Sequence, residues 1–186
     1  YRSIKDSKAG FLSVEMNDGT EISVTTTKRT AIAKFKFSSN DKGSIIIGSG
    51  INSTKVKDAF VTNTSLTSCE GYATGGDFCG TDTNYPVFFY VEFDRPSLNH
   101  KVWKKNKISK NKSIDGPNSG TIFTFDTSKN KEVNYRISIS FVSVENAKIN
   151  MKSEDVGFNF QSYLSINQAS WNEKLSTILI LSLIHI

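Results

Sequence analysis

The sequence predicts a mainly β fold, an antiparallel β-sandwich followed by a C-terminal α-helical segment. Short runs of alternating apolar and polar residues recur over residues 1–142 with no helical periods between them. This pattern is typical of antiparallel sheets rather than of alternating strands and helices. After Val142 the apolar residues recur at helical spacing. The chain has 186 residues, which is long enough for one domain with its own core.

The first predicted strands form a hairpin. Gly10–Met16 and Glu21–Thr27 alternate, and Asn17–Gly19 between them contains the Asp-Gly pair that favours a tight turn. Thr30–Phe37 follows as the clearest half-buried strand, because every second residue is apolar. Its apolar face consists of Ala31, Ala33, Phe35 and Phe37.

Four further runs complete the predicted sheets. Ser44–Gly48 is interpreted as a short buried strand, since it contains three consecutive isoleucines. Pro86–Asp94 is rich in aromatic and β-branched residues and predicts the strongest strand. Thr121–Asp126 and Val133–Val142 follow, the latter with clean alternation.

Two polar or glycine-rich stretches are interpreted as loops. Gly71–Gly80 contains four glycines, and Lys101–Lys112 contains six lysines, which account for much of the net charge of +5. A single-stranded nucleic-acid site would interleave aromatic residues with the basic ones, and only Trp103 is near. We therefore expect a solvated loop and no nucleic-acid partner. No apolar run is long enough to predict a membrane span.

Two helices are predicted after the strands. Ser143–Lys152 has Ser143 as its expected N-cap, and residues 160–178 form a second helix capped by Ser162 or Ser165. The apolar stripe of the second helix needs a surface to pack against, which indicates more protein downstream. The expected division is a sandwich over 1–142, a helical linker over 143–178, and an apolar tail over 179–186 of doubtful origin.

The cysteines and the sequons bear on the compartment of the protein. Cys69 and Cys79 have neither the spacing nor the histidine neighbours of a zinc site. A disulfide between them would require an oxidising compartment, and the sequence leaves that pairing open. The Asn-x-Ser/Thr triplets are compatible with secretion. They begin at Asn52, Asn63 and Asn111.

Several stretches resemble one family in order along the chain. Thr74–Gly80 reads as a Gly-x-Phe-Cys-Gly turn and leads into Phe88–Pro96, which ends Phe-Asp-Arg-Pro before Trp103. These motifs, like Glu21–Phe37, Ile139–Asn150 and Ala169–Asn172, resemble the N-terminal domain of glycoside hydrolase family 92, the calcium-dependent exo-α-mannosidases. Ser7–Phe11 departs from the family pattern, since the expected His and Pro are missing.

The resemblance implies a fold and a function. The fold is a galactose mutarotase-like supersandwich. The function is that of the N-terminal domain of a secreted or periplasmic inverting exo-α-mannosidase, which acts on mannose-containing glycans, for example in N-glycan processing. Such a domain packs on a helical (α/α) catalytic barrel, and the barrel holds most of the calcium site. Inversion needs two carboxyl groups about 6.5–9.5 Å apart. The family places them in that barrel, so we expect no catalytic residue, no metal ligand and no hydrolysis from this chain alone.

The predicted substrate-binding residues lie in two places. Arg29 connects two strands, where its fork of donors could bind sugar hydroxyls or an acid of the partner domain. In Gly71–Gly80, Gly76 would let the backbone approach a sugar, and Tyr72 and Phe78 would stack on a pyranose. Cys79 would form a small wall. The alternatives are a surface arginine in a turn and a purely structural loop.

Trp103, the acidic pair and the overall function each allow more than one interpretation. Trp103 could stack on a sugar, although core packing is the more frequent role of such a residue. The acidic pair Glu154–Asp155 is interpreted as a solvated helix end. A stand-alone carbohydrate-binding module and a structural or adhesion domain are the alternative functions. The helical segment favours the enzyme domain, because a finished module does not need it.

Overall fold

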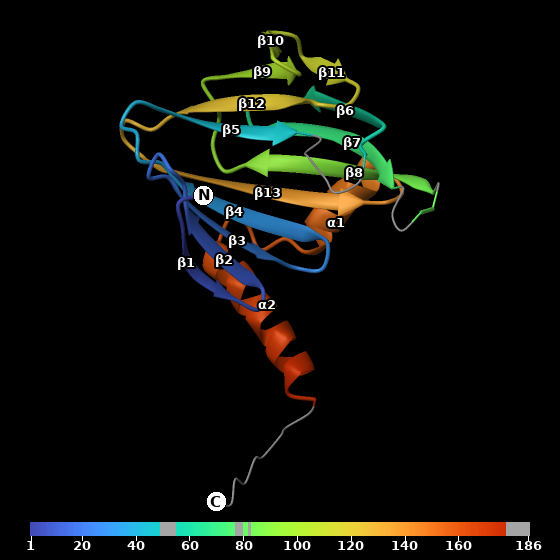
Figure 1. The fold of residues 1–186 in the computed structure, drawn as a ribbon. Coiled ribbons are helices and arrows are strands. Elements are labelled where there is room, and N and C mark those ends of the chain that lie inside the picture. The colour runs from blue at the N-terminus through green and yellow to red at the C-terminus, as the bar shows by residue number, and fades with distance from the viewer. Residues whose placement is uncertain (49–54, 77–79, 82, 178–186) are drawn as a thin grey trace, which may run out of the picture.

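Two antiparallel sheets pack face to face in the computed structural model, which describes residues 1–48, 55–76, 80–81 and 83–177 (Figure 1). Two helices follow the last strand. The predicted mainly β sandwich with a C-terminal helical segment is therefore confirmed.

The sheets differ in size. In spatial order the nine-stranded sheet contains β1 (Ser3–Lys8), β2 (Phe11–Glu15), β3 (Glu21–Thr26), β4 (Thr30–Lys36), β13 (Glu132–Ser140), β8 (Asn84–Phe93), β7 (Ser68–Gly76), β6 (Asp58–Asn63) and β11 (Ser113–Asp115). The four-stranded sheet contains β10 (Lys107–Ser109), β9 (Asn99–Lys104), β12 (Ser119–Asp126) and β5 (Lys42–Gly48).

The core lies between the smaller sheet and the centre of the larger one. β13 occupies that centre, where Tyr135 pairs with Ala33 of β4 on one side and with Phe93 of β8 on the other. The Phe93 ring is 4.7 Å from Phe123 and 5.0 Å from Phe125 of the smaller sheet, measured between centroids. Inward-facing residues of the two sheets interdigitate in this way in β-sandwiches.

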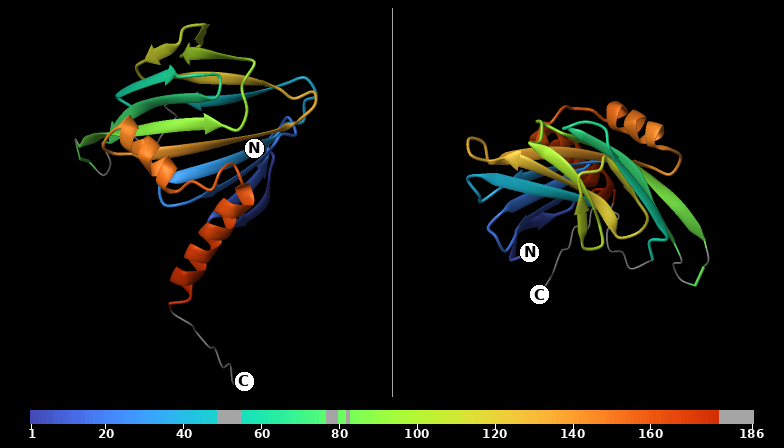
Figure 2. Two further views of the ribbon diagram at one scale, coloured as in Figure 1. Left: turned by 180° about the vertical axis from the view of Figure 1, so that it is seen from behind. Right: turned by 90° about the horizontal axis from the view of Figure 1, so that it is seen from above.

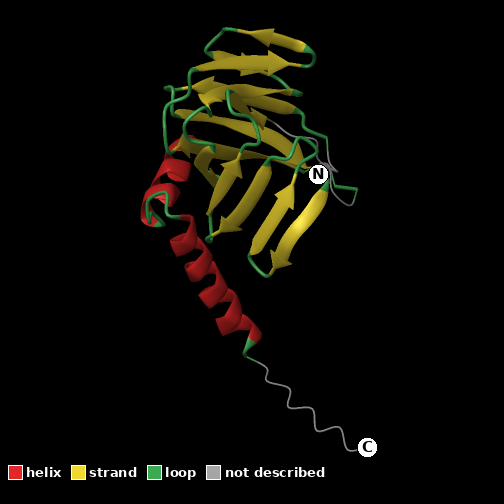
Figure 3. Ribbon diagram, turned by 90° about the vertical axis from the view of Figure 1, so that its left-hand side faces the viewer, coloured by secondary structure: helices red, strands yellow, loops and turns green. Residues whose placement is uncertain are grey.

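The helices cover the outer face of the larger sheet (Figure 2). α1 (Val144–Ser153) begins at the predicted cap, because the Asn146 N–H donates to Ser143 Oγ at 3.1 Å. α2 (Phe160–Leu175) begins at the expected residue but has a different cap. Its cap is Asn159, whose Oδ1 accepts from the Ser162 N–H, so the predicted serine caps are wrong. α2 projects away from the sandwich (Figure 3).

The two predicted loops contain strands. Gly71–Gly76 belongs to β7, where Gly71 pairs with Phe89 of β8. A Cβ on Gly71 would lie 1.9 Å from the Phe60 carbonyl oxygen, so this glycine permits close strand approach rather than a loop. Likewise, Lys101–Lys112 contains most of β9 and all of β10, joined at Lys105, whose φ is 54°.

Other differences concern exposure and weak strands. Ile46 is 63% exposed, so Ser44–Gly48 alternates between two faces and is not uniformly buried. β1 and β6 were missed because neither has a long apolar alternation. Strands end at Ser140 and helices begin at Val144, but the division into domains at 142 stays a prediction. Residues 179–186 lie outside the described residues.

Candidate functional site

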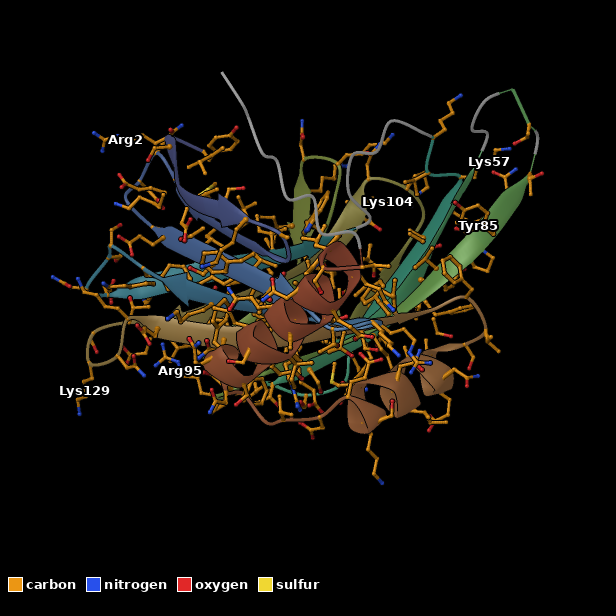
Figure 4. The ribbon with its side chains drawn as sticks, turned by 90° about the horizontal axis from the view of Figure 1, so that it is seen from below. Arg2, Lys57, Tyr85, Arg95, Lys104 and Lys129 are labelled. Atoms are coloured by element: carbon orange, nitrogen blue, oxygen red, sulfur yellow. The ribbon has the colours of Figure 1, made fainter. Side chains whose placement is uncertain are left out.

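A groove of about 700 Å³ separates the β3–β4 turn from the helices. Figure 4 views the molecule from this side, with α2 in front of the larger sheet. Three elements form the walls: the turn, the residues that end α1, and the outer part of α2. The lining residues are Thr26, Thr27, Lys28, Arg29, Ser153, Glu154, Asp155, Val156, Ile166, Asn167, Ser170 and Trp171.

Arg29 is held at the rim of this groove by Glu154. The Arg29 backbone N–H donates to Glu154 Oε2 at 3.0 Å, and its Nε donates to Oε1 at 2.9 Å. Thr27 Oγ1 also donates to Oε2. The Arg29 side chain is 52% exposed, whereas that of Glu154 is 12% exposed. The carboxylate therefore fixes the arginine from below, and the outer guanidinium edge faces solvent.

Glu154 is an ionised anchor rather than a catalytic acid. Burial raises the pKa of its carboxyl, but the hydrogen bonds from Thr27 and Arg29 outweigh burial and lower the pKa below its ordinary value. A general acid in glycoside hydrolysis needs a raised pKa. Glu154 is therefore unsuited to that role.

The acidic pair ends α1 as expected, and Asp155 is exposed, but each of the two acids also has an arginine partner. Arg136 of β13 donates from Nη1 to Asp155 Oδ1 and from Nη2 to Glu92 Oε2, the latter at 2.7 Å. Its guanidinium also lies 4.4 Å from the Phe158 ring centroid. Both acids thus tie the end of α1 to the sheet, and the predicted solvation holds for Asp155 but not for Glu154, which is 12% exposed.

Asn167 of α2 forms the floor of the groove. Its Nδ2 donates to the Gly10 carbonyl at 3.1 Å, to Thr26 Oγ1 at 3.0 Å and to Thr25 Oγ1 at 3.3 Å. Asn167 is 6% exposed, so these bonds compensate the burial of a polar group. Sequence reasoning missed this residue, because its partners lie more than 140 positions away.

Above the floor, the groove combines apolar and polar surfaces. Trp171 and Ile166 of α2 line one wall and are 46% and 45% exposed. Arg29 and Ser170 supply hydrogen-bonding groups. An exposed indole beside such groups is suited to binding sugar rings or an apolar surface of another domain.

The predicted site residues are not gathered in this groove. Arg29 lines it, but β13 and β8 separate β4 from β7, which carries Tyr72 and Gly76. The Tyr72 ring lies between those of Phe60 and Phe88, with centroids 6.3 Å and 5.9 Å away. Its hydroxyl donates to Asp58 Oδ2 at 2.8 Å. Tyr72 is thus engaged with neighbouring strands, and its binding role stays a prediction.

Gly76 ends β7 with φ of 151°, and a Cβ there would lie 1.9 Å from the Thr83 carbonyl oxygen. Close strand approach therefore explains this glycine. Phe78 and Cys79 lie outside the described residues, as does any pairing through Cys79. Cys69 is a buried free cysteine in β7, and burial raises the pKa of its thiol far above the ordinary value.

The described part of the chain offers neither a cluster of metal ligands nor a membrane-spanning helix. Within it, no three His, Cys, Asp or Glu side chains come together as metal ligands. No helix there is both long and apolar enough to cross a bilayer.

Solved structures with the same architecture are carbohydrate-active enzymes. A family GH92 α-mannosidase from Bacteroides thetaiotaomicron matches with a TM-score of 0.82 and 21% identity over 93% of this chain. An inverting mannosidase of family GH92 from the same organism gives 0.78 and 19% over 89%. A bacterial glucoamylase complexed with acarbose gives 0.58 and 11% over 95%. The fold is therefore that of a glycosidase β-sandwich domain.

The family follows from the sequence itself. The family model described as the glycosyl hydrolase family 92 N-terminal domain matches residues 3–140. The chain therefore belongs to glycosyl hydrolase family 92 and carries its N-terminal domain. It spans 24% of the matched α-mannosidase and 22% of the inverting mannosidase. No curated protein matches the sequence.

Proposed function

We propose that this chain is the N-terminal domain of a secreted exo-α-mannosidase that acts on α-mannosides of glycans. The family match over residues 3–140 carries the proposal. The solved family members that it resembles include an α-mannosidase and an inverting mannosidase. A stand-alone carbohydrate-binding module is the alternative, because the groove beside Trp171 and Arg29 has sugar-binding chemistry of its own.

In this proposal the domain shapes the substrate site and packs on a catalytic domain. The support is the surface of α2, where Ile166, Trp171 and Leu175 are 45%, 46% and 61% exposed. Apolar side chains in such number on one helix are typical of an interface. Arg29, pre-positioned by Glu154, would offer its free edge to a sugar hydroxyl or to a carboxylate of that domain.

The chemistry itself is assigned to the catalytic domain. An inverting glycosidase uses one carboxylic acid to protonate the leaving oxygen and one carboxylate to activate water. Glu154 and Asp155 are each committed to an arginine, so neither serves in that pair. Calcium dependence is proposed from the family resemblance alone, with ligands outside this chain.

The deciding experiment compares this chain with the longer product of its gene. The longer protein should release mannose from α-mannobiose with inversion at the anomeric carbon, observed by NMR, and lose activity with a calcium chelator. The 186-residue chain should release none. A longer product without mannosidase activity would contradict the proposal. Millimolar or weaker binding of α-mannobiose by this chain is expected, and tight binding would favour the stand-alone module.

The sequons provide a separate test of the sandwich that the proposal assumes. Asn63 is 1% exposed and its Oδ1 accepts from Thr121 Oγ1 at 2.8 Å, whereas Asn111 is exposed. A bulky glycan is compatible only with the exposed position. In protein made in a eukaryotic secretory pathway, mass spectrometry should find a glycan on Asn111 and none on Asn63. Modified Asn63 would contradict the described fold around β6.

A further inference from the structure

The outer face of the four-stranded sheet carries an apolar surface that the proposed function does not use. Ile46 and Ile108 on this face are 63% and 62% exposed, and the strand register places Ile122 and Trp103 between them. We call Trp103, Ile46, Ile108 and Ile122 the tryptophan face. An exposed patch of this kind on a folded domain usually marks an interaction site.

Trp103 is laid across the sheet by two glycines. Its register partner on β12 is Gly120, and Gly120 pairs with Gly48 of β5. A Cβ on Gly120 would lie 2.7 Å from the indole Nε1, and a Cβ on Gly48 would lie 2.8 Å from Cζ2. Any larger residue at either position would lift the ring. The absence of side chains at Gly120 and Gly48 therefore allows the indole to lie flat on the sheet.

Hydrogen bonding does not explain that placement. The indole N–H is buried and has no partner within the described part of the chain. A buried donor without a partner costs about 1–3 kcal/mol. The unpaired indole N–H therefore lowers the stability of the folded protein, and local features that lower stability are common at binding sites.

The surroundings of the tryptophan face are basic. Lys101 pairs with Ile122 on the same face, and Lys105 and Lys107 stand at the adjoining β9–β10 turn. All three are exposed, and no described carboxylate lies within ion-pair distance of them. Ser44 and Thr124 share a hydrogen bond of 3.0 Å at the other end of the face. The ligand that complements this surface is anionic and rich in hydroxyl groups.

The tryptophan face also lies far from the helical segment. β9 and β10 are at one end of the molecule and α2 leaves the sandwich at the opposite end (Figures 1 and 3). A contact made by the projecting end of α2 would therefore lie on the opposite side of the sandwich from this face.

We propose that the tryptophan face binds an anionic glycan, in which a pyranose ring stacks on Trp103 and a phosphate or carboxylate group meets Lys101. The C–H groups of a sugar ring complement the negative face of an indole. A lysine ammonium acts as a point charge for an anionic group. This site is independent of the proposed catalytic function, because it lies on this chain alone.

The test uses the fluorescence of Trp103 in the 186-residue chain. Trp171 is the second of its two tryptophans, so Trp171→Phe leaves Trp103 as the single reporter. Phosphorylated yeast mannan, polygalacturonate and neutral mannan are titrated in turn. The emission of Trp103 should shift with phosphorylated mannan, with polygalacturonate or with both. A shift with phosphorylated mannan alone identifies phosphate as the anionic group, and a shift with polygalacturonate alone identifies carboxylate. Binding should weaken about tenfold in 0.5 M salt, and neutral mannan should bind at least about tenfold more weakly.

Surface variants separate the specific site from general charge. Ile46→Glu places a negative charge on the face at a 63% exposed position and should abolish binding while circular dichroism stays unchanged. Lys101→Gln should weaken binding about tenfold, whereas Lys129→Gln, an equal charge change at the β12–β13 turn, should not. No emission change with either anionic glycan, equal binding of neutral mannan, or equal losses in both lysine variants would overturn the proposal.

Discussion

Among the arginines in ion pairs with the helical segment, Arg136 is expected to contribute more to the free energy of unfolding than Arg29. Its side chain is 7% exposed and it joins Glu92 of β8 to Asp155 after α1. Burial lowers the pKa of Arg136, but the hydrogen bond to Glu92 and the charge of Asp155 outweigh it and raise the pKa, so the group stays charged. Its removal takes away two charge-assisted hydrogen bonds and leaves Glu92 and Asp155, which are 34% and 43% exposed, without their partner.

Arg136→Met should therefore lower the free energy of unfolding by about 3 kcal/mol, since hydrogen bonds to charged groups contribute about 1.5–3 kcal/mol each and solvent partly compensates the two carboxylates. Urea unfolding measures the difference. Arg29→Met is the matched control, because its 52% exposed side chain should cost only about 1 kcal/mol. Equal losses in the two variants would show that burial does not distinguish these two ion pairs.

Glu154 predicts a pH dependence of stability. Its pKa is lower in the folded protein than in the unfolded chain. Its contribution is therefore complete above the unfolded value of about 4.3 and is lost as the pH falls through the folded pKa. Glu154→Gln should cost about 2 kcal/mol at pH 7, where it removes charged hydrogen bonds, and less at pH 3.

Urea midpoints of wild type and variant at both pH values test this expectation. The exposed Glu132 provides the control, since Glu132→Gln should leave the midpoint nearly unchanged at either pH. A difference between wild type and Glu154→Gln that stayed constant from pH 7 to pH 3 would contradict the assigned direction of the pKa.

At the scale of elements, the close contact between Gly10 and Asn167 helps to hold α2 on the sheet. Gly10 has φ of 75°, and a Cβ there would lie 2.3 Å from Asn167 Oδ1. Gly10→Ala therefore combines backbone strain with a clash that pushes α2 away. Gly157→Ala has a similar φ of 68° but open space around the added methyl group.

Gly10→Ala should thus lower the free energy of unfolding by about 1–2 kcal/mol more than Gly157→Ala, as measured by thermal or urea unfolding. Both variants place an alanine in a left-handed backbone conformation, and only Gly10→Ala adds a clash. Asn167→Ala in the Gly10→Ala background should recover part of the loss, because it removes the clashing amide. Equal costs for the two glycine variants would mean that α2 is not held at Gly10.

The elements also show how far the sequence predicts this fold. β8 was predictable from its aromatic and β-branched residues, and β13 from its alternation of apolar and polar residues. β7 was not, since Gly71 and Gly76 are selected by the approach of neighbouring strands, which local sequence does not contain. The Asn159 cap was passed over for nearby serines, although asparagine is an equally good N-cap.

The candidate site divides in the same way. Arg29 was predictable as a binding residue, because it lies in the connection between two strands and its guanidinium offers several hydrogen-bond donors. Its fixed orientation was not, because Glu154 is 125 positions away. Arg136 and Asn167 were missed for the same reason: their partners are assembled by the packing of helices on the sheet. The family motifs are short stretches of single strands and helices, and they do not contain such long-range pairings.

Over the whole molecule, the larger sheet extends beyond the smaller one. The register places Ile4, Val14, Ile22 and Phe35 in one row across β1–β4, and Phe35 packs against the core. Burial falls along this row, since Ile4 is 54% exposed. Of the six residues of β1, five are exposed and the sixth is only half-buried. Local stability should therefore decrease from the centre of the sheet toward β1.

Native-state hydrogen exchange measures that gradient. Amides of β13 and β8, paired on both sides and packed on the core, should exchange only through global unfolding. Amides of β1 should exchange at least about a hundredfold faster, because opening an edge strand exposes little apolar surface. Arg136→Met should accelerate β13 and leave β1 unchanged, since β1 already opens independently. Uniform protection across β1, β8 and β13 would instead show that the larger sheet unfolds as one cooperative unit despite the uncovered row.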